Sequence, residues 1–180
     1  MRSDEALAAG VQHGSQADMQ TLVERYYEPL LRFSFWLSGG DQTQAEDMTQ
    51  ETFLRMMRGI AGYDPSRPFK PWLYAIAEHV ACNLAMRAEH RRTINLPDDF
   101  DIPEEAAQPE QRTESTEAQQ SILAGLRRLP VRQREVIVLF YYQDLPQKEI
   151  AELLGVPIGT VKSRLSLGIK QLRAWMEVNA

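Results

Sequence analysis

The chain has 180 residues, of which 25 are acidic and 20 are basic, so its formal net charge at pH 7 is −5. This acidity argues against a protein that coats nucleic acid without specificity, and a single cysteine, Cys82, excludes an internal disulfide and a cluster of thiolates within the chain. No apolar run reaches the roughly 18 residues of a membrane span, and the first residues lack the pattern of a secretory signal. We therefore expect a cytoplasmic protein that is not membrane-inserted.

The first half of the sequence is predicted to be a series of helices. Residues 1–16 show no clear periodicity, and we expect them to be weakly structured. Apolar residues at intervals of three and four then predict helices over about residues 18–27, 28–37, 41–60 and 71–92. Pro29 is expected to divide the first of these helices from the second, and Gly39-Gly40 is expected to end the second.

A change in charge separates the two halves of the sequence. Residues 96–118 contain eight acidic residues and one basic residue, together with prolines, and we interpret 96–117 as a flexible acidic linker. Helices are predicted again over about residues 116–129 and 131–142, followed by a helix pair over 146–173. The predicted fold class is all-α, with small helical domains at 1–95 and 118–180 joined by the linker.

The helix pair over 146–173 has the pattern of a helix-turn-helix. Ala151 is small where the two helices would cross, and Gly155 tolerates the left-handed backbone of the turn between them. Such a unit places its second helix in the major groove of DNA. Most amphipathic helix pairs bind no DNA, but from residue 158 to residue 178 the sequence has four basic residues and one acidic residue. Because a merely solvated helix face usually mixes both signs, this charge pattern favours DNA binding.

Nothing in the sequence predicts an active site, a cofactor or a metal site. The Walker A motif and the nucleophile elbow are both absent, and no constellation of catalytic carboxylates is recognisable. The three histidines are scattered, and His79 with Cys82 would supply only two ligands of a zinc site. We expect a protein that is not an enzyme and has no small-molecule substrate.

Four sequence segments occur in order around the acidic linker. They are QAEDMTQETFL at 44–54, FKPWLYAIA at 69–77, LPVRQREV at 129–136 and GVPIGTVKSRL at 155–165. With these segments the chain resembles a bacterial extracytoplasmic-function (ECF) sigma factor, the minimal form of the sigma-70 family, over about residues 19–176. The resemblance implies a subunit that binds RNA polymerase core, directs initiation at specific promoters and is controlled by an anti-sigma factor.

The resemblance also implies which residues contact the polymerase and the promoter DNA. The helix near residue 50 would dock on the clamp coiled coil of the largest polymerase subunit through Asp47, Gln50, Glu51 and Arg55. The 63–70 loop and the helix after it would melt and read the minus-10 element through Tyr63, Arg67, Lys70, Trp72, Tyr74, His79, Asn83, Arg87 and Arg91. The second helix of the helix-turn-helix would contact the minus-35 element through Thr160, Lys162, Ser163, Arg164, Ser166 and Lys170.

Several of these residues also have a simpler interpretation. The polar face near residue 50 could be an ordinary solvated helix face. Phe69 and Leu73 are expected in the core, whereas Trp72 and Tyr74 could either be buried or face DNA. Cys82 is expected to be a buried, inert thiol rather than a redox sensor.

Two other functions compete with that of a sigma factor. A conventional helix-turn-helix regulator would bind an operator without polymerase core, but it would leave the polar face at 44–58 and the aromatic and basic stretch at 63–92 unexplained. A sigma mimic that sequesters an anti-sigma factor would not need the basic residues of the last helix. Salt-dependent DNA binding would separate the mimic from the other two functions.

Overall fold

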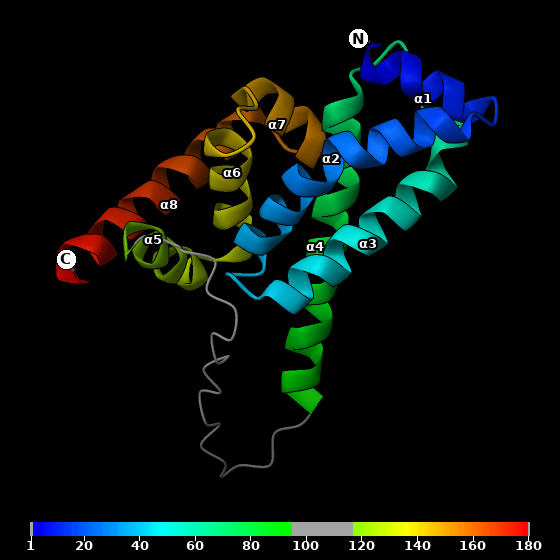
Figure 1. Cartoon of the computed structure of the whole chain (residues 1–180). Coiled ribbons are helices and arrows are strands. Elements are labelled where there is room, and N and C mark those ends of the chain that lie inside the picture. The colour runs from blue at the N-terminus through cyan, green and yellow to red at the C-terminus, as the bar shows by residue number, and fades with distance from the viewer. Residues whose placement is uncertain (1, 95–116, 180) are drawn as a thin grey trace.

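The structure is a computed structural model that describes residues 2–94 and 117–179, with the side chains of residues 2–84 and 120–178. These residues form α1 (Asp4–Gln12), α2 (Gln16–Leu37), α3 (Gln42–Gly59), the short 3₁₀ helix η1 (Ile60–Gly62), α4 (Phe69–Ile94), α5 (Glu117–Arg128), α6 (Val131–Tyr141), α7 (Gln147–Leu154) and α8 (Ile158–Asn179) (Figure 1). No strand occurs among them, which confirms the all-α fold class. The predicted linker at 96–117 lies outside the described residues except for its last position. In the two described ranges no helix has the length and apolarity needed to cross a membrane.

Three long helices form the first half of the molecule. α2 and α3 lie side by side, and α4 packs against both of them (Figure 1). Large side chains close the contacts between these helices, and Leu30, Phe33, Met56 and Leu73 are all completely buried. The removal of this apolar surface from water is the main favourable contribution to the stability of such a helical unit.

Residues 4–12 form a helix, so the expectation of a weakly structured start is wrong for them. Ser3 caps α1 by accepting a hydrogen bond from the Ala6 N–H at 3.2 Å. Leu7 and Ala8 are buried, and α1 packs chiefly against α2. The sequence signal for α1 is weak because only two of its residues enter the core, and the packing that holds it comes from a later helix.

Pro29 does not divide two helices but lies inside the single helix α2. A proline removes one helical hydrogen bond and disturbs the turn before it. Tyr26 and Leu30, on either side of the proline, are both buried. Packing on both sides of the proline keeps the helix continuous, and this packing is not visible in the sequence alone.

The second half contains the predicted helix-turn-helix. α7 ends at Leu154, and Gly155 follows with a φ of 63°, the left-handed conformation that the sequence predicts for this position. The Val156 N–H then donates to the Ala151 carbonyl at 3.0 Å, which closes the turn. α8 packs against α5, α6 and α7, with Val161 and Leu165 buried. The helix-turn-helix geometry is therefore confirmed.

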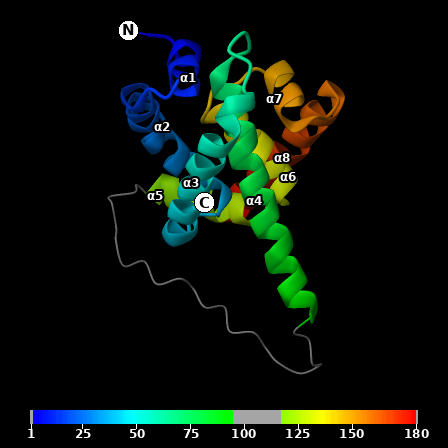
Figure 2. The ribbon, with the colours of Figure 1, turned by 90° about the vertical axis from the view of Figure 1, so that its right-hand side faces the viewer.

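The two halves lie against each other. α6 contacts α2, and α6 and α7 both contact α4. Figure 2 shows α4 running beside α6 and α7. The buried apolar residues of the described ranges form one cluster that includes both halves. Polar contacts join the halves as well, and these involve several of the residues predicted to bind DNA.

Two glycines test the packing around α8. A Cβ at Gly125 would lie 2.4 Å from Leu172 Cδ1 and 3.0 Å from Trp175 Cε3, whereas a Cβ at Gly159 would meet nothing within 4 Å. We expect Gly125→Ala to lower the free energy of unfolding by about 1–3 kcal/mol because it overpacks the contact between α5 and α8. The matched variant Gly159→Ala should be neutral or stabilising by at most about 1 kcal/mol, since alanine favours a helix. Thermal and urea unfolding of both variants measures the difference, and equal effects would contradict the packing described.

Candidate nucleic-acid interface

The outer side of α8 is the more accessible part of the predicted interface. Among the residues predicted to contact the minus-35 element, Lys162, Ser163, Ser166 and Lys170 are exposed, whereas Thr160 and Arg164 are half-buried. Ser163 uses its hydroxyl to donate to the Thr160 carbonyl at 3.0 Å. Further along α8, Ser166, Lys170 and Arg173 line a shallow hollow. This side of the helix therefore offers cations and hydroxyls, which suit contacts to phosphates and base edges.

Arg164 differs from the other cations of α8 because its side chain turns inward. Its Nη1 lies 3.2 Å from Glu135 Oε1, and only 23% of the side chain is exposed. Glu135, on α6, is 1% exposed. The arginine expected to grip the DNA backbone thus compensates a buried carboxylate in this structure.

Glu135 belongs to a polar cluster at the junction of the two halves, which the sequence analysis missed. Arg132 Nη1 bridges Glu78 Oε1 of α4 at 2.9 Å and Glu135 Oε2 at 3.6 Å. Cys82 Sγ donates to Glu78 Oε1 at 2.9 Å and lies 4.0 Å from Glu135 Oε2. The sequence carries one signal of this cluster: Glu78 and Cys82 are four residues apart and therefore share a helix face.

Burial dominates the electrostatics of this cluster. Loss of water around Glu135 raises the pKa of its carboxyl group, and the nearby Glu78 raises it further, against the opposing effect of Arg132 and Arg164. Burial, followed by the hydrogen bond to Glu78, raises the pKa of the Cys82 thiol to about 12. The thiol is therefore buried and protonated at neutral pH, as an inert cysteine would be. Glu78, Cys82 and Glu135 lie close enough to share a metal ion, but the arginines already compensate both carboxylates.

The aromatic residues expected near the minus-10 element lie mainly in the core. Phe69 and Leu73 are completely buried, as predicted. Tyr63 is 5% exposed, and its ring centroid lies 4.8 Å from that of the half-buried Trp72. Tyr74 is 0% exposed, and its hydroxyl has no hydrogen-bond partner among the described residues. In this arrangement of the helices, the rings of Tyr63 and Tyr74 cannot stack on a DNA base, because other side chains cover them.

The basic residues of the same region differ in their accessibility. The Arg67 side chain is 81% exposed at the tip of the loop before α4. Lys70 Nζ instead donates to the Gln143 carbonyl of the second half at 2.7 Å and lies 5.9 Å from the centre of the Tyr74 ring. His79 is exposed and Asn83 is half-buried, both on α4. For the predicted sites Arg87 and Arg91 the backbone belongs to α4, but their side chains lie outside the described part of the structure.

The face predicted to bind the polymerase lies on α3 and is open. Asp47 and Gln50 are exposed, while Glu51 and Arg55 form an ion pair with a separation of 2.6 Å between Oε1 and Nε. Leu54 and Met57 are 42% and 45% exposed on the same helix. The neighbouring Met56 is completely buried, so α3 turns one of the two adjacent methionines inward and the other outward. The helix thus combines fixed charges with accessible apolar side chains, a composition suited to a protein partner.

Two arginines that bind the end of α2 across the junction of the halves were also missed by the sequence analysis. Arg134 Nη1 donates to the Leu37 carbonyl at 2.7 Å, and Arg127 Nε donates to the Gly39 carbonyl. The C-terminus of α2 therefore receives two guanidinium groups from the other half, in line with its negative helix dipole. Gly39-Gly40 ends a helix and leaves such carbonyls unpaired, so the sequence does contain a partial signal for this contact.

The polar residues thus form two open surfaces and one closed junction. The α3 face and the outer side of α8 are accessible, whereas Lys70 and Arg164, both predicted to bind DNA, are engaged at or beside the junction of the halves. The described residues offer no constellation resembling an active site, and the accessible chemistry is that of binding.

Models of known families match both halves of the chain. A model of sigma-70 region 2 matches residues 22–92, and a model of sigma-70 region 4 matches residues 119–172. Both matches fall on the helical halves described above, and α1 precedes the first of them.

Individual proteins with similar sequences and folds are known. The ECF RNA polymerase sigma factor SigE of Mycolicibacterium smegmatis is 36% identical over 167 residues, which cover 91% of this chain and 64% of that protein. SigW of Bacillus subtilis, another ECF RNA polymerase sigma factor, is 32% identical over 171 residues and 91% of each chain. Two solved structures share the fold. The structure of CnrH in complex with the cytosolic domain of CnrY has a TM-score of 0.72 and 24% identity, and the match covers 99% of this chain and 100% of that chain. The structure of the sigma factor RpoE in complex with the anti-sigma factor NepR from Bartonella quintana has a TM-score of 0.71 and 22% identity, and the match covers 91% of this chain and 99% of that chain.

The raised pKa of Glu135 predicts a pH-dependent stability. The folded chain binds the carboxyl proton of Glu135 more tightly than the unfolded chain does. Protonation of Glu135 therefore adds to the free energy of unfolding. This addition is complete below the ordinary pKa of 4.5 and is lost as the pH rises through the raised pKa. Glu135→Gln imitates the protonated carboxyl, so we expect the melting temperature of the variant relative to wild type to increase as the pH rises from about 4.5. Melting curves across this pH range measure the difference. The exposed Glu152→Gln on α7 is the control, and parallel curves for Glu135→Gln and wild type would contradict the prediction.

Proposed function

The chain belongs to the extracytoplasmic-function sigma factors of the sigma-70 family, and from this membership we propose how its two halves share the recognition of a promoter. As a sigma factor it binds RNA polymerase core and promoter DNA, directs transcription initiation and is not an enzyme. The proposed division assigns core binding and the minus-10 element to residues 1–95, and the minus-35 element to residues 118–180. The observation that carries it is the order of the two region matches, each on one helical half.

The outer side of α8 is proposed to enter the major groove at the minus-35 element. Lys162, Ser163, Ser166 and Lys170 are accessible there, and the buried Val161 and Leu165 hold the helix from behind. Cations next to short hydroxyls suit phosphate and base contacts. These accessible cations also distinguish the chain from a sigma mimic, which has no need of them.

The minus-10 element is proposed to be read by the first half after the halves separate. Arg67 is already accessible, whereas Lys70 donates to Gln143 across the junction. Within the second half, Arg164 of α8 is held by Glu135 of α6, a contact that does not cross the junction. DNA phosphates would replace the Gln143 carbonyl and the Glu135 carboxylate as partners of these cations. The buried Tyr63 and Tyr74 support the loop and α4 from within in this proposal.

Core binding is proposed to use the α3 face formed by Asp47, Gln50, Glu51 and Arg55. An operator-binding regulator without polymerase core would not account for this face, where Leu54 and Met57 add exposed apolar area. We also propose that the chain acts in the cytoplasm under the control of an anti-sigma factor, as the complex of RpoE with NepR suggests by analogy.

In vitro transcription tests the function directly. Bacterial core polymerase is supplied with this protein, or without it, on a library of genomic fragments. New discrete start sites that share paired upstream elements would support the proposal. An absence of new starts, together with no binding to core in a parallel pull-down, would favour the operator-binding regulator or the sigma mimic.

Lys162 offers the cleanest test of the recognition helix because it is exposed and makes no contact at the junction. We expect Lys162→Ala to weaken binding to the minus-35 element about five- to tenfold and to reduce the salt slope of binding by about 1 if the lysine contacts a phosphate. Binding to core should not change. The control is Lys148→Ala, an exposed lysine on α7 outside the recognition helix. Equal effects of the two variants would show that α8 is placed wrongly.

The α3 face is tested by removing its two exposed polar groups. We expect the double variant Asp47→Ala with Gln50→Ala to bind core polymerase about 30-fold more weakly, since interface contacts of this size are worth about 1 kcal/mol each. Its melting temperature should stay close to that of wild type because both side chains are exposed. Glu28→Ala, an exposed residue of α2 outside the α3 face, is the control. Unchanged affinity in the double variant would leave the α3 face as an ordinary solvated surface.

A further inference from the structure

Helix α1 lies outside the residues matched by the two region models, yet its side chains reach the segment proposed to read the minus-10 element. This segment is the loop of residues 63–68 between η1 and α4, called here the minus-10 loop. Residues 64–68 are all exposed. Two side chains of α1 contact the backbone at the two ends of the loop, and neither has a role so far.

Gln12 holds the first end of the minus-10 loop. Its Nε2 donates to the Ile60 carbonyl at 2.8 Å and to the Tyr63 carbonyl at 2.7 Å. Both hydrogens of one amide group therefore bind carbonyls that flank the end of η1, where the chain leaves helical geometry. The Ile60 carbonyl also accepts a hydrogen bond from the Tyr63 N–H at 3.1 Å. The Gln12 amide therefore adds a second hydrogen bond there and also binds the Tyr63 carbonyl beyond the end of η1.

Glu5 holds the second end of the loop. Its Oε1 accepts a hydrogen bond from the Phe69 N–H at 3.1 Å. Phe69 is the first residue of α4, so this N–H belongs to the helix terminus that favours a negative charge. Backbone N–H groups, first that of Glu5 itself and then that of Phe69, lower the pKa of the Glu5 carboxyl group. The carboxylate is therefore ionised at neutral pH and suited to this contact.

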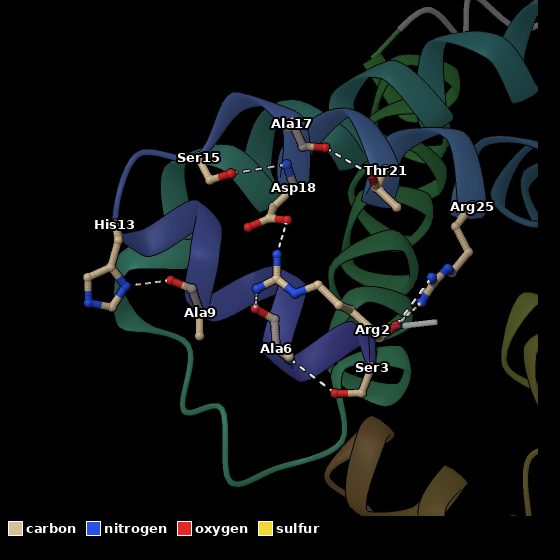
Figure 3. Close-up of polar contacts among 10 residues, drawn as sticks. All are labelled: Arg2, Ser3, Ala6, Ala9, His13, Ser15, Ala17, Asp18, Thr21 and Arg25. Carbon is tan, nitrogen blue, oxygen red and sulfur yellow. Dashed lines mark hydrogen bonds and ion pairs between the residues drawn. The ribbon is translucent and has the colours of Figure 1, made fainter.

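α1 is itself fixed to α2, so that it can act as a support. Asp4 accepts hydrogen bonds from the Tyr26 hydroxyl at 2.6 Å and from Arg25. Figure 3 shows Arg2 donating to Asp18 of α2 and, at 2.9 Å, to the Ala6 carbonyl.

Gly10 contributes to the same attachment. A Cβ at this position would lie 1.8 Å from Asp18 Oδ2, so the close approach of Asp18 to α1 requires a glycine here. Ser15 caps α2 next to it, since its hydroxyl accepts from the Asp18 N–H at 3.3 Å. The attachment of α1 therefore combines several side chains with one residue that must stay small.

Beneath the minus-10 loop lies a platform of rings. Phe69 meets Tyr63 edge to face at 5.5 Å between ring centroids and lies 5.6 Å from the Tyr26 ring of α2. Within the loop, Asp64 Oδ1 accepts from the Ser66 N–H at 3.0 Å, and Arg67 projects into solvent. The loop is thus supported from below by rings and held at its ends by α1, while its tip remains accessible.

We propose that α1 is a positioning element for the minus-10 loop, with Gln12 and Glu5 as positioning residues that hold the two ends of the loop ready to receive the promoter strand. A loop that is ordered before binding loses less conformational freedom when it binds. The inference rests on the proposed function, because the loop is assigned to the minus-10 element there. It adds a specificity role for residues that contact no DNA.

The test uses holoenzyme assembled from core polymerase and the full chain, on a promoter identified by the transcription experiment. Gln12→Ala removes both hydrogen bonds, and Gln12→Glu keeps the size of the side chain but places a carboxylate beside two carbonyls. We expect each to lower the rate of open-complex formation about 30-fold, the effect of two ordinary hydrogen bonds. The control is Gln20→Ala, because the Gln20 amide donates only to Glu24 of the same helix, at 2.7 Å.

The decisive measurement is discrimination among single-base changes in each promoter element. Positioning predicts that the Gln12 variants discriminate less among minus-10 sequences but as well as wild type among minus-35 sequences, with core affinity retained. The defect should persist on a template whose minus-10 element is already unpaired, because the variants impair capture rather than melting of the strand. At the other end of the loop, Glu5→Ala should show the same defect, and Glu5→Gln, which can still accept from Phe69, should restore most of the activity.

Two results would overturn the inference. One is unchanged minus-10 discrimination in both Gln12 variants. The other is a loss of discrimination at both elements that follows the melting temperature, which would assign α1 a structural role only. A wild-type holoenzyme that starts at no promoter would instead refute the proposed function, so the two failures are distinguishable.

Discussion

The buried carboxyl group of Glu135 is the centre of the polar contacts where the two halves meet. It lies where α6 meets α4, next to Glu78 and Cys82, and Arg132 and Arg164 compensate its charge. A buried carboxylate that loses its partners is strongly destabilising. Since Arg164 belongs to the recognition helix, the same side chain stabilises the packed form and is proposed to contact DNA. Arg164 and Glu135 both belong to the second half, so contact of this cation with DNA would be coupled to the packing of α8 on α6.

Other polar and aromatic side chains also join the two halves, and one of them is proposed to bind DNA. Lys70, proposed to contact the promoter, donates to the Gln143 carbonyl, and Arg134 donates to the Leu37 carbonyl at the end of α2. Trp36 and Tyr142 stack across the junction with ring centroids 4.4 Å apart. The surfaces on α3 and on the outer side of α8 remain accessible in the packed form. A partner can therefore reach these two surfaces while the halves are packed against each other.

The sequence predicted most of the helices because their apolar periodicity is strong and their ends are marked by glycine, proline and capping residues. The helix-turn-helix is the clearest case, since Gly155 adopts the left-handed conformation that its position requires. The failures are equally specific. α1 was missed because it buries only Leu7 and Ala8, and Pro29 was read as a boundary although packing on both sides keeps α2 continuous. Apolar type alone does not distinguish the exposed Met57 from the buried Met56.

The sequence by itself determined the all-α class, the family and the residue types on the faces proposed to bind DNA and polymerase, because these depend on local periodicity and short motifs. Only the tertiary structure decided which of those residues are accessible. The sequence offers Tyr74, Arg164, Arg67 and Lys162 as candidates for DNA contact. In the structure Tyr74 is buried in the core and Arg164 is paired with Glu135, whereas Arg67 and Lys162 are exposed. The contacts of Gln12 and Glu5 with the minus-10 loop join residues at least 48 positions apart. Such pairings arise from the packing of helices, and no local pattern encodes them.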